Sequence, residues 1–353
     1  MIGKIYIFLL AFFIPAISFA GDRTIYGSDN RADFYQTTSD RKILADSVVS
    51  FWKNDQVENK GSMSELTVSI FGQAYNLCDG QRYERQYMGA FCSGSLVGED
   101  LVLTAAHCVK TEEACKNTKL VFGFKVSKDG QPGVYDIPSS DVYSCSKIEA
   151  KFYHKTDTIT GVQGQNEGSD YAVIRLDRKV INHKPLAVNF GTQMKNGDEI
   201  FVIGYPVGIP LKVADGAKVR SNSMSAYYST DLDTFGGNSG SPVFNARTNL
   251  IEGILVRGGT DFVRTPDGCR IYSVVGQNEG RGEDVTKISE VAPSLIPLLK
   301  GSSKENKIET DVVSVPFDPD NSVYSCDSSI FGADCGNKEN ILKKINQISA
   351  DWH

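Results

Sequence analysis

Three side chains of this sequence could together cleave an amide or ester bond: His107, Asp170 and Ser239. A serine hydroxyl is a weak nucleophile near neutral pH, so a base has to take its proton. A carboxylate has to hold that base in one tautomer, and fixed N–H donors have to stabilise the oxyanion that forms on the substrate. The sequence contains a candidate for each of these parts.

Ser239 lies in the run "TFGGNSGSPVF", residues 234–244. The neighbouring Gly236, Gly237 and Gly240 allow backbone angles that other residues adopt only with strain. In such a loop the N–H groups of Gly237 and Ser239 can converge on one point and form an oxyanion hole. A glycine-rich turn between two strands explains the same run if it is considered alone.

His107 is the candidate base because an apolar strand in "GEDLVLTAAHCVK" leads to small residues that leave room for its imidazole. Asp170, in "EGSDYAVIRLDR", begins another apolar strand, where a carboxylate is costly to bury unless a partner pairs with it. Taken singly, a structural histidine and a turn aspartate are the commoner interpretations. The other histidines, His154, His183 and His353, have polar or charged neighbours and no comparable setting.

The chain has eight cysteines, and an even number in an exported protein indicates disulfides. Cys92 precedes the strand that leads to Cys108, so we expect this pair to brace that strand. Local spacing alone suggests Cys326–Cys335. With four histidines and no C-x-x-C spacing, we expect no metal and no other cofactor. Three pairings remain for Cys78, Cys115, Cys145 and Cys269, and we favour Cys115–Cys145.

The first twenty residues, "MIGKIYIFLLAFFIPAISFA", have the layout of a secretory signal peptide cleaved after Ala20. An uncleaved anchor is the alternative, but the apolar run is short for a membrane span. We therefore expect a secreted or periplasmic protein that does not associate with membranes after cleavage. A formal net charge of −6 gives no electrostatic footprint for nucleic acid.

The elements that must position the three side chains are predicted mostly as strands, because short β-rich runs alternate with Gly, Asn, Asp and Pro turns. Many short strands with few helices indicate an all-β sandwich or barrel. The stretch "SDRKILADSVVSFW" has helical spacing, and residues 288–300 predict a short C-terminal helix. The expected organisation is a signal peptide (1–20), an N-terminal arm or propeptide (21–65), a main domain (66–300), and a linker with a small disulfide-containing extension (301–353).

Together these motifs resemble the chymotrypsin-like (trypsin-like) serine proteases. "TAAHC" matches the histidine motif of that family and "GNSGSP" the bacterial form of its serine motif, in the family's order of His, Asp and Ser. The run around Asn238 is similar to the branch that contains the bacterial glutamyl endopeptidases. The resemblance implies two six-stranded antiparallel β-barrels with the active site between them. It also implies a serine endopeptidase whose partners are protein or peptide substrates.

The same resemblance implies where a substrate binds. Val256 to Gly258 corresponds to the strand that pairs with the substrate backbone. The base of the first specificity pocket falls at Asp233, whose carboxylate would favour Lys or Arg side chains. Leu255 stands where glutamate-specific relatives carry a histidine. Arg270, in "CRIYSVV", could instead point into the pocket, pair with Asp233, and block it or turn it toward acidic residues.

Two positions depart from the family pattern. Asn238 stands where pancreatic-type enzymes carry an aspartate that pairs with a new N-terminal amine, and an amide cannot make that ion pair. Val256 replaces a serine that donates to the triad aspartate, so Asp170 is expected to lack that donor.

A different class of function stays open at this stage, a protease-fold binding or adhesion protein that has lost activity. Such proteins usually lose a triad residue or obstruct the pocket, and all three triad candidates are present here. An esterase of the α/β-hydrolase type fits poorly, because its nucleophile motif is G-x-S-x-G and its helices alternate with strands. Reaction with a fluorophosphonate probe distinguishes an active serine enzyme from an inactive one.

Overall fold

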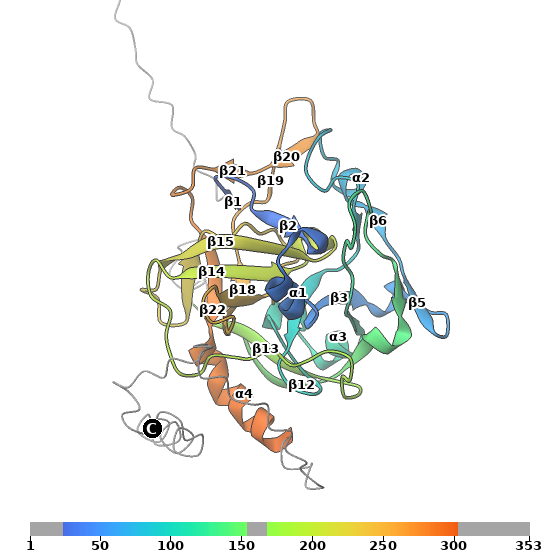
Figure 1. Cartoon of the computed structure of the whole chain (residues 1–353), viewed down its shortest axis with the longest axis vertical. Coiled ribbons are helices and arrows are strands. Elements are labelled where there is room, and N and C mark those ends of the chain that lie inside the picture. The colour runs from blue at the N-terminus through green and yellow to red at the C-terminus, as the bar shows by residue number, and fades with distance from the viewer. Residues whose placement is uncertain (1–23, 154–167, 303–353) are drawn as a thin grey trace, which may run out of the picture.

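The computed structural model describes residues 24–153 and 168–302. In Figure 1 the strands gather into two units, with the C-terminal helix α4 (Ile288–Ser302) projecting from them. Among these residues no helix has the length and hydrophobicity needed to cross a membrane. The predicted signal peptide and the Cys326–Cys335 pair lie outside the described residues.

The first unit is a closed antiparallel barrel of six strands in the order β10-β12-β13-β9-β8-β3, and β10 also pairs with β3. Strands β8 and β9 are buried along their whole length, because one face fills the barrel and the other is covered. The bounds are β3 (Val48–Lys53), β8 (Cys92–Leu96), β9 (Leu101–Thr104), β10 (Thr118–Val121), β12 (Val142–Tyr153) and β13 (Asp170–Leu176).

The second unit closes in the same way, because β14 pairs with both β17 and β15. Alternate residues of β14 serve different cores, since Ile200 and Val202 fill this barrel while Phe201 and Ile203 join the other cluster. The strand order is β14-β17-β18-β22-β16-β15. The bounds are β14 (Glu199–Gly204), β15 (Lys212–Ser221), β16 (Tyr227–Thr230), β17 (Pro242–Asn245), β18 (Ile251–Arg257) and β22 (Glu283–Lys287).

Short helices and strands lie outside the two six-stranded barrels. The N-terminal arm adds β2 (Arg31–Asp33) to β15 and β1 (Ile25–Tyr26) to β21 (Val274–Val275). An insertion of the first barrel contains α2 (Phe71–Tyr75), which lies beside the β19–β20 hairpin of the second barrel (Figure 1). The remaining elements are α1 (Ser39–Ala45), β4 (Val57–Asn59), β5 (Met63–Leu66), β6 (Ser69–Ile70), β7 (Tyr87–Met88), α3 (Glu112–Lys116), β11 (Asp136–Pro138), β19 (Phe262–Arg264) and β20 (Arg270–Tyr272).

The fold confirms the two predicted barrels and the C-terminal helix, and it corrects two details near residue 50. The main domain does not begin at residue 66, because β3 is already a strand of the first barrel. The helix expected over "SDRKILADSVVSFW" stops at Ala45. The valines and aromatic residues that follow favour a strand, and β3 is paired on both sides.

Three disulfides connect described residues: Cys92–Cys108, Cys115–Cys145 and Cys78–Cys269. The first two are those that the sequence favours. The third joins the α2 insertion of the first barrel to the β19–β20 hairpin of the second. It therefore ties together two loops that are 191 residues apart in the chain.

Candidate active site

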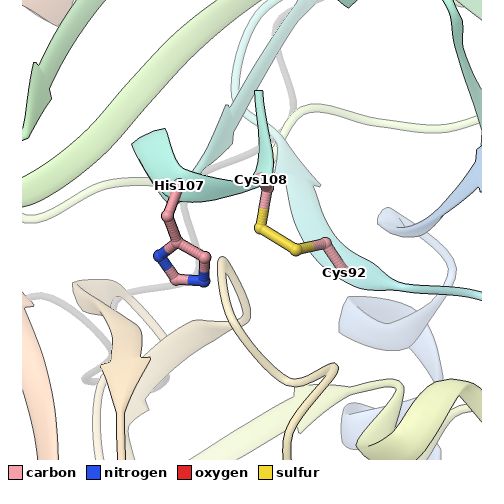
Figure 2. A group of neighbouring side chains, drawn as sticks. All are labelled: Cys92, His107 and Cys108. Atoms are coloured by element: carbon pink, nitrogen blue, oxygen red, sulfur yellow. A yellow bond between two sulfur atoms is a disulfide. The ribbon is translucent and has the colours of Figure 1, made fainter. Parts of the chain in front are cut away.

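His107 lies where β9 ends and the chain makes a single 3-10 turn, Ala106–Cys108. The Cys92–Cys108 disulfide fixes this turn to β8, and Figure 2 shows the imidazole beside the disulfide. Ligand atoms of Cys92, His107 and Cys108 lie within 4.8 Å of one another. Because both sulfur atoms are bonded to each other, neither is a thiolate that could bind a metal ion.

Asp170, the first residue of β13, reaches His107 from the neighbouring strand of the same barrel. Its Oδ2 lies 2.6 Å from Nδ1 of His107. Its Oδ1 accepts hydrogen bonds from the backbone N–H groups of Ala106 (2.7 Å) and His107 (3.3 Å). The Asp170 side chain is 2% exposed and that of His107 28%. The carboxylate is therefore fixed and shielded, while the outer nitrogen of the imidazole stays accessible.

Residues that sequence reasoning missed hold Asp170 in place. The hydroxyl of Thr286, on β22, lies 3.2 Å from both the backbone N and the backbone O of Asp170. Helix α4 contacts both neighbours of Asp170, through a hydrogen bond from Ser169 to Glu290 and a 3.0 Å hydroxyl contact between Tyr171 and Ser294. Val256 donates nothing to the Asp170 carboxylate, as the sequence led us to expect. Only the long-range pairing of β22 brings Thr286 here, so no local motif could have identified it.

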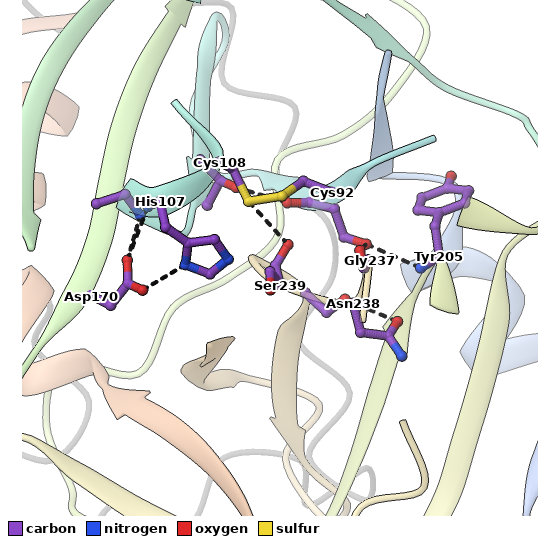
Figure 3. The surroundings of a disulfide bond; sticks show 12 residues. Cys92, His107, Cys108, Asp170, Tyr205, Gly237, Asn238 and Ser239 are labelled. Atoms are coloured by element: carbon purple, nitrogen blue, oxygen red, sulfur yellow. Dashed lines mark hydrogen bonds and ion pairs between the residues drawn. A yellow bond between two sulfur atoms is a disulfide. The ribbon is translucent and has the colours of Figure 1, made fainter. Parts of the chain in front are cut away.

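Ser239 precedes β17, in a loop of the second barrel that contacts the first barrel. Its carbonyl oxygen accepts a hydrogen bond from the N–H of Ser93 on β8 (2.9 Å) and lies 3.6 Å from the Cys108 sulfur. Gly240 makes this approach possible, because its φ is +88° and an added Cβ would lie 2.1 Å from the Ser93 carbonyl oxygen. Figure 3 shows Ser239 next to the imidazole of His107, on the side away from Asp170.

The backbone around Ser239 directs two N–H groups toward the cleft. The Gly236 carbonyl accepts from the N–H of Val207 (2.5 Å), and the Asn238 carbonyl accepts from that of Ser241 (2.9 Å). In a trans peptide the N–H points opposite to the carbonyl, so the N–H groups of Gly237 and Ser239 are turned away from these anchors. Neither N–H has an acceptor within the described part of the chain. Their role as oxyanion donors stays a prediction of the sequence analysis.

Ser93 is a second residue that the motifs did not reveal. Its hydroxyl donates to the Gly237 carbonyl (2.9 Å) and accepts from the N–H of Tyr205 (3.0 Å), so one side chain of the first barrel links two segments of the second. Ser93 therefore positions the loop that carries the candidate oxyanion donors.

We expect Ser93→Ala to lower kcat about tenfold with little change in KM, because the Gly237 peptide loses its anchor while the substrate pairing strand is untouched. Removal of an oxyanion donor itself typically costs 100-fold or more, so a loosened loop should cost less. Steady-state kinetics on one peptide substrate measure the effect. Ser95→Ala is the matched control, since Ser95 lies on the same strand and its buried hydroxyl has no hydrogen-bond partner among the described residues. Equal kcat values for the two variants would contradict a positioning role.

A cavity of about 120 Å³ opens beside Ser239. It lies against the end of β18, where Val256 and Gly258 border it as the resemblance implied. Two acidic residues, Asp261 and Glu283, also border it. The full lining is Thr234, Phe235, Gly236, Ser239, Leu255, Val256, Arg257, Gly258, Gly259, Asp261 and Glu283.

Two residues that the sequence analysis placed in the pocket are not among those that line the cavity, Asp233 and Arg270. Both oxygens of Asp233 accept backbone N–H groups of the N-terminal arm, from Tyr26 at 2.8 Å and from Asn30 at 2.7 Å. Arg270 lies on β20, whose backbone pairs with residues next to α2. The strand that closes the pocket is β22, not "CRIYSVV", so neither the Asp233 base nor an inward Arg270 agrees with the structure.

A comparison with known families identifies a peptidase domain in the part of the chain that contains the candidate site. Residues 92–254 match the family model described as "Trypsin-like peptidase domain". The chain contains a trypsin-like peptidase domain. The match includes His107, Asp170 and Ser239, although it does not by itself assign their roles.

The trypsin-like domain has one distant curated relative of note, a glutamyl endopeptidase of Staphylococcus epidermidis. The two are 35% identical over 102 residues, which is 26% of this chain and 35% of the relative. The chain thus matches about a third of the relative's length.

Solved structures with a similar arrangement include a Glu endopeptidase in complex with MPD (17% identity, TM-score 0.43, covering 78% of this chain and 99% of that one). The Vibrio cholerae VesB protease has 15% identity and a TM-score of 0.43, covering 76% of this chain and 66% of that one. The scabies mite inactivated protease paralogue S-I1 has 16% identity and a TM-score of 0.44, covering 78% and 99%.

Proposed function

We propose that the protein is an exported serine endopeptidase with a triad of His107, Asp170 and Ser239. The observation that carries this proposal is the buried Asp170 carboxylate 2.6 Å from Nδ1 of His107, because this contact holds the imidazole with its other nitrogen free to accept a proton. The three disulfides favour an oxidising compartment and agree with export.

In the acylation step the Ser239 hydroxyl oxygen bonds to the substrate carbonyl carbon while its proton moves to Nε2 of His107. The carbonyl π electrons become an oxyanion, which the N–H groups of Gly237 and Ser239 stabilise. The C–N bond then breaks, and the imidazolium donates its proton to the leaving amine. Water repeats the sequence on the acyl-enzyme, releases the acid product and restores the Ser239 hydroxyl.

The substrate backbone would add to the edge of β18 near Val256 and Gly258, which gives affinity without dependence on sequence. Among substrate side chains, we propose a preference for Lys or Arg next to the cleaved bond. The name of the staphylococcal relative describes that protein's specificity for glutamyl residues. In this chain Leu255 stands at the position where the resemblance expects a histidine in glutamate-specific enzymes. Two of the three ionisable residues that line the cavity, Asp261 and Glu283, are acidic, and the third, Arg257, donates to Asp284.

Digestion of a denatured protein, followed by mass spectrometry of the products, tests the proposed function. We expect internal cuts that are abolished by prior fluorophosphonate treatment. An intact substrate after incubation with folded protein would instead support the alternative of a protease-fold binding or adhesion protein.

A further inference from the structure

We propose that Glu283 and Asp261 bind the cationic side chain of the lysine or arginine whose carbonyl Ser239 attacks. The inference rests on the proposed function and assigns its specificity to two carboxylates that no sequence motif singled out. Both border the cavity beside Ser239, one from β22 and one from the segment just before β19. Converging carboxylates from two separate elements make a site for a compact cation.

Glu283 forms the inner wall of the cavity. Its Oε2 accepts a 2.7 Å hydrogen bond from the Thr234 hydroxyl, and Oε1 lies 3.4 Å from the N–H of Gly259. A Cβ on Gly258 would lie 1.9 Å from Oε2, so glycine at this position is needed for the carboxylate to stand against the substrate strand. The side chain is held in one place at the wall, next to where a substrate backbone would pair.

Asp261 lies next to the nucleophile loop. Its Oδ2 accepts a 2.8 Å hydrogen bond from the N–H of Gly236, the residue before the oxyanion donor Gly237. The buried Thr24 hydroxyl, which has no hydrogen-bond partner among the described residues, also lies near this carboxylate. An ammonium or guanidinium group between Asp261 and Glu283 would therefore belong to the same substrate residue as the carbonyl that Ser239 attacks.

The N-terminal arm contacts both Glu283 and Asp233. The hydroxyl of Tyr26 lies 3.3 Å from Oε1 of Glu283, and the N–H of the same residue donates to Asp233. Asp233 therefore anchors the arm, and the arm in turn contacts Glu283. Asp233, which the family pattern places at the pocket base, does not border the cavity. We infer that it acts as a positioning residue, because it holds the arm that contacts Glu283.

The cations around the cavity have partners other than this pair of carboxylates. Arg257 donates to Asp284 (3.1 Å). Arg31 makes two 2.8 Å hydrogen bonds to Asp29 and lies 3.9 Å from the centre of the Phe235 ring. Arg220 lies 4.4 Å from the centre of the Tyr26 ring. Among the described residues, no ion pair joins a basic side chain to Glu283 or Asp261, so a substrate cation would supply such a partner.

Proton uptake by the two carboxylates makes the proposed binding depend on pH. Burial raises the pKa of Glu283 to about 8. The hydrogen bond from Thr234 acts to lower this pKa, and the charge of Asp261 acts to raise it. Burial raises the pKa of Asp261 to about 6, although the hydrogen bond from the Gly236 N–H and the charge of Arg31 both act to lower it. The other titratable or charged groups near them include Tyr26 and Tyr75, whose pKa values burial also raises, and Arg220 beyond Tyr26. A bound cation favours the ionised carboxylates, so it should bind better as the pH rises from 5 to 9.

The test compares two peptide substrates that differ only at the residue before the cleaved bond, arginine in one and glutamine in the other. We expect Glu283→Gln to lower the ratio of their kcat/KM values about 100-fold and Asp261→Asn about tenfold, because truncating one partner of a buried charge pair has effects of this size. In the wild type the ratio should rise with pH between 5 and 9, and the rise should be weaker in Glu283→Gln. Taking the ratio cancels any effect of pH that acts equally on both substrates.

Glu252→Gln is the matched control, because Glu252 is also a buried acid of the second barrel but borders a separate cavity with Asn189 and Tyr228. Its substrate ratio should equal that of the wild type. Fluorophosphonate labelling of every variant separates the two proposals: a labelled variant has an intact triad, and loss of labelling in the wild type would count against the proposed function instead. An unchanged ratio in labelled Glu283→Gln and Asp261→Asn, or a wild-type preference for glutamate, would overturn the inference.

Discussion

Ser239→Ala should lower peptidase kcat by about 10⁴-fold or more and leave the fold intact. The substitution removes one oxygen from a half-buried loop residue whose backbone contacts, through the Ser93 N–H, do not involve the hydroxyl. Without the nucleophile no acyl-enzyme forms, and only the oxyanion donors and substrate binding can contribute to the residual rate. Initial rates on a peptide substrate measure the loss, and circular dichroism and the melting temperature report on the fold.

Ser241→Ala is the control for this variant. Ser241 lies in the same loop, but its hydroxyl is 3.4 Å from the side-chain oxygen of Asn238 and is buried against Gly204. We expect this variant to keep its activity within a few-fold of the wild type. Turnover by Ser239→Ala at the wild-type rate would end the triad assignment.

Asp170→Asn should lower kcat by about 10⁴-fold, with a small effect on KM. The amide can still accept from the N–H groups of Ala106 and His107, so the turn should persist. An amide N–H facing Nδ1 of His107 would favour the tautomer whose proton is on Nε2, and that nitrogen could then no longer accept the Ser239 proton. Measurement of kcat and KM on the same substrate separates this effect from a loss of binding.

Asp55→Asn, an exposed change remote from the active site, controls for the general effect of removing a carboxylate. We expect wild-type kinetics for it. If Asp170→Asn retained more than about a tenth of the wild-type kcat, the carboxylate would not be fixing the tautomer of His107.

Short motifs identified the residues of the proposed triad because the loops and turns that carry them are local features. Gly237 and Gly240 have φ values of +89° and +88° and lie where an added Cβ would meet neighbouring backbone. The conformation of this loop therefore requires glycine at these positions, and the sequence shows it directly. The same holds for the small residues before His107, which stand at the turn after β9. In both places the conformation depends on a few consecutive residues.

The specificity pocket was not predictable in this way, because its wall depends on which strands pair. The sequence suggested "CRIYSVV" as the closing strand, but β22 pairs with β18 and brings Glu283 to the cavity. In the linear sequence Glu283 is one of several charged residues in a polar stretch. Asp233, at the position where the family pattern expects the pocket base, is instead covered by the backbone of the N-terminal arm, a segment whose packing no local motif specified.

The start of the barrel was missed for a related reason. Residues 39–51 contain apolar side chains at helical spacing, yet Ile43 is 71% exposed and only the part up to Ala45 is helical. From Val48 onward, pairing with β8 and β10 on both sides outweighs the helical pattern. Tertiary pairing of this kind overrides local preference wherever a strand is central in a sheet.

Site-specific labelling by a fluorophosphonate tests the central claim most directly, because the reagent forms a bond only with a serine that a neighbouring base activates. The wild-type protein, with its disulfides intact, should gain one adduct, and peptide mapping should place that adduct on Ser239. Asp170→Asn should label far more slowly, and Ser239→Ala not at all. Absence of an adduct on the folded wild-type protein, or an adduct on a different serine, would contradict the proposed triad.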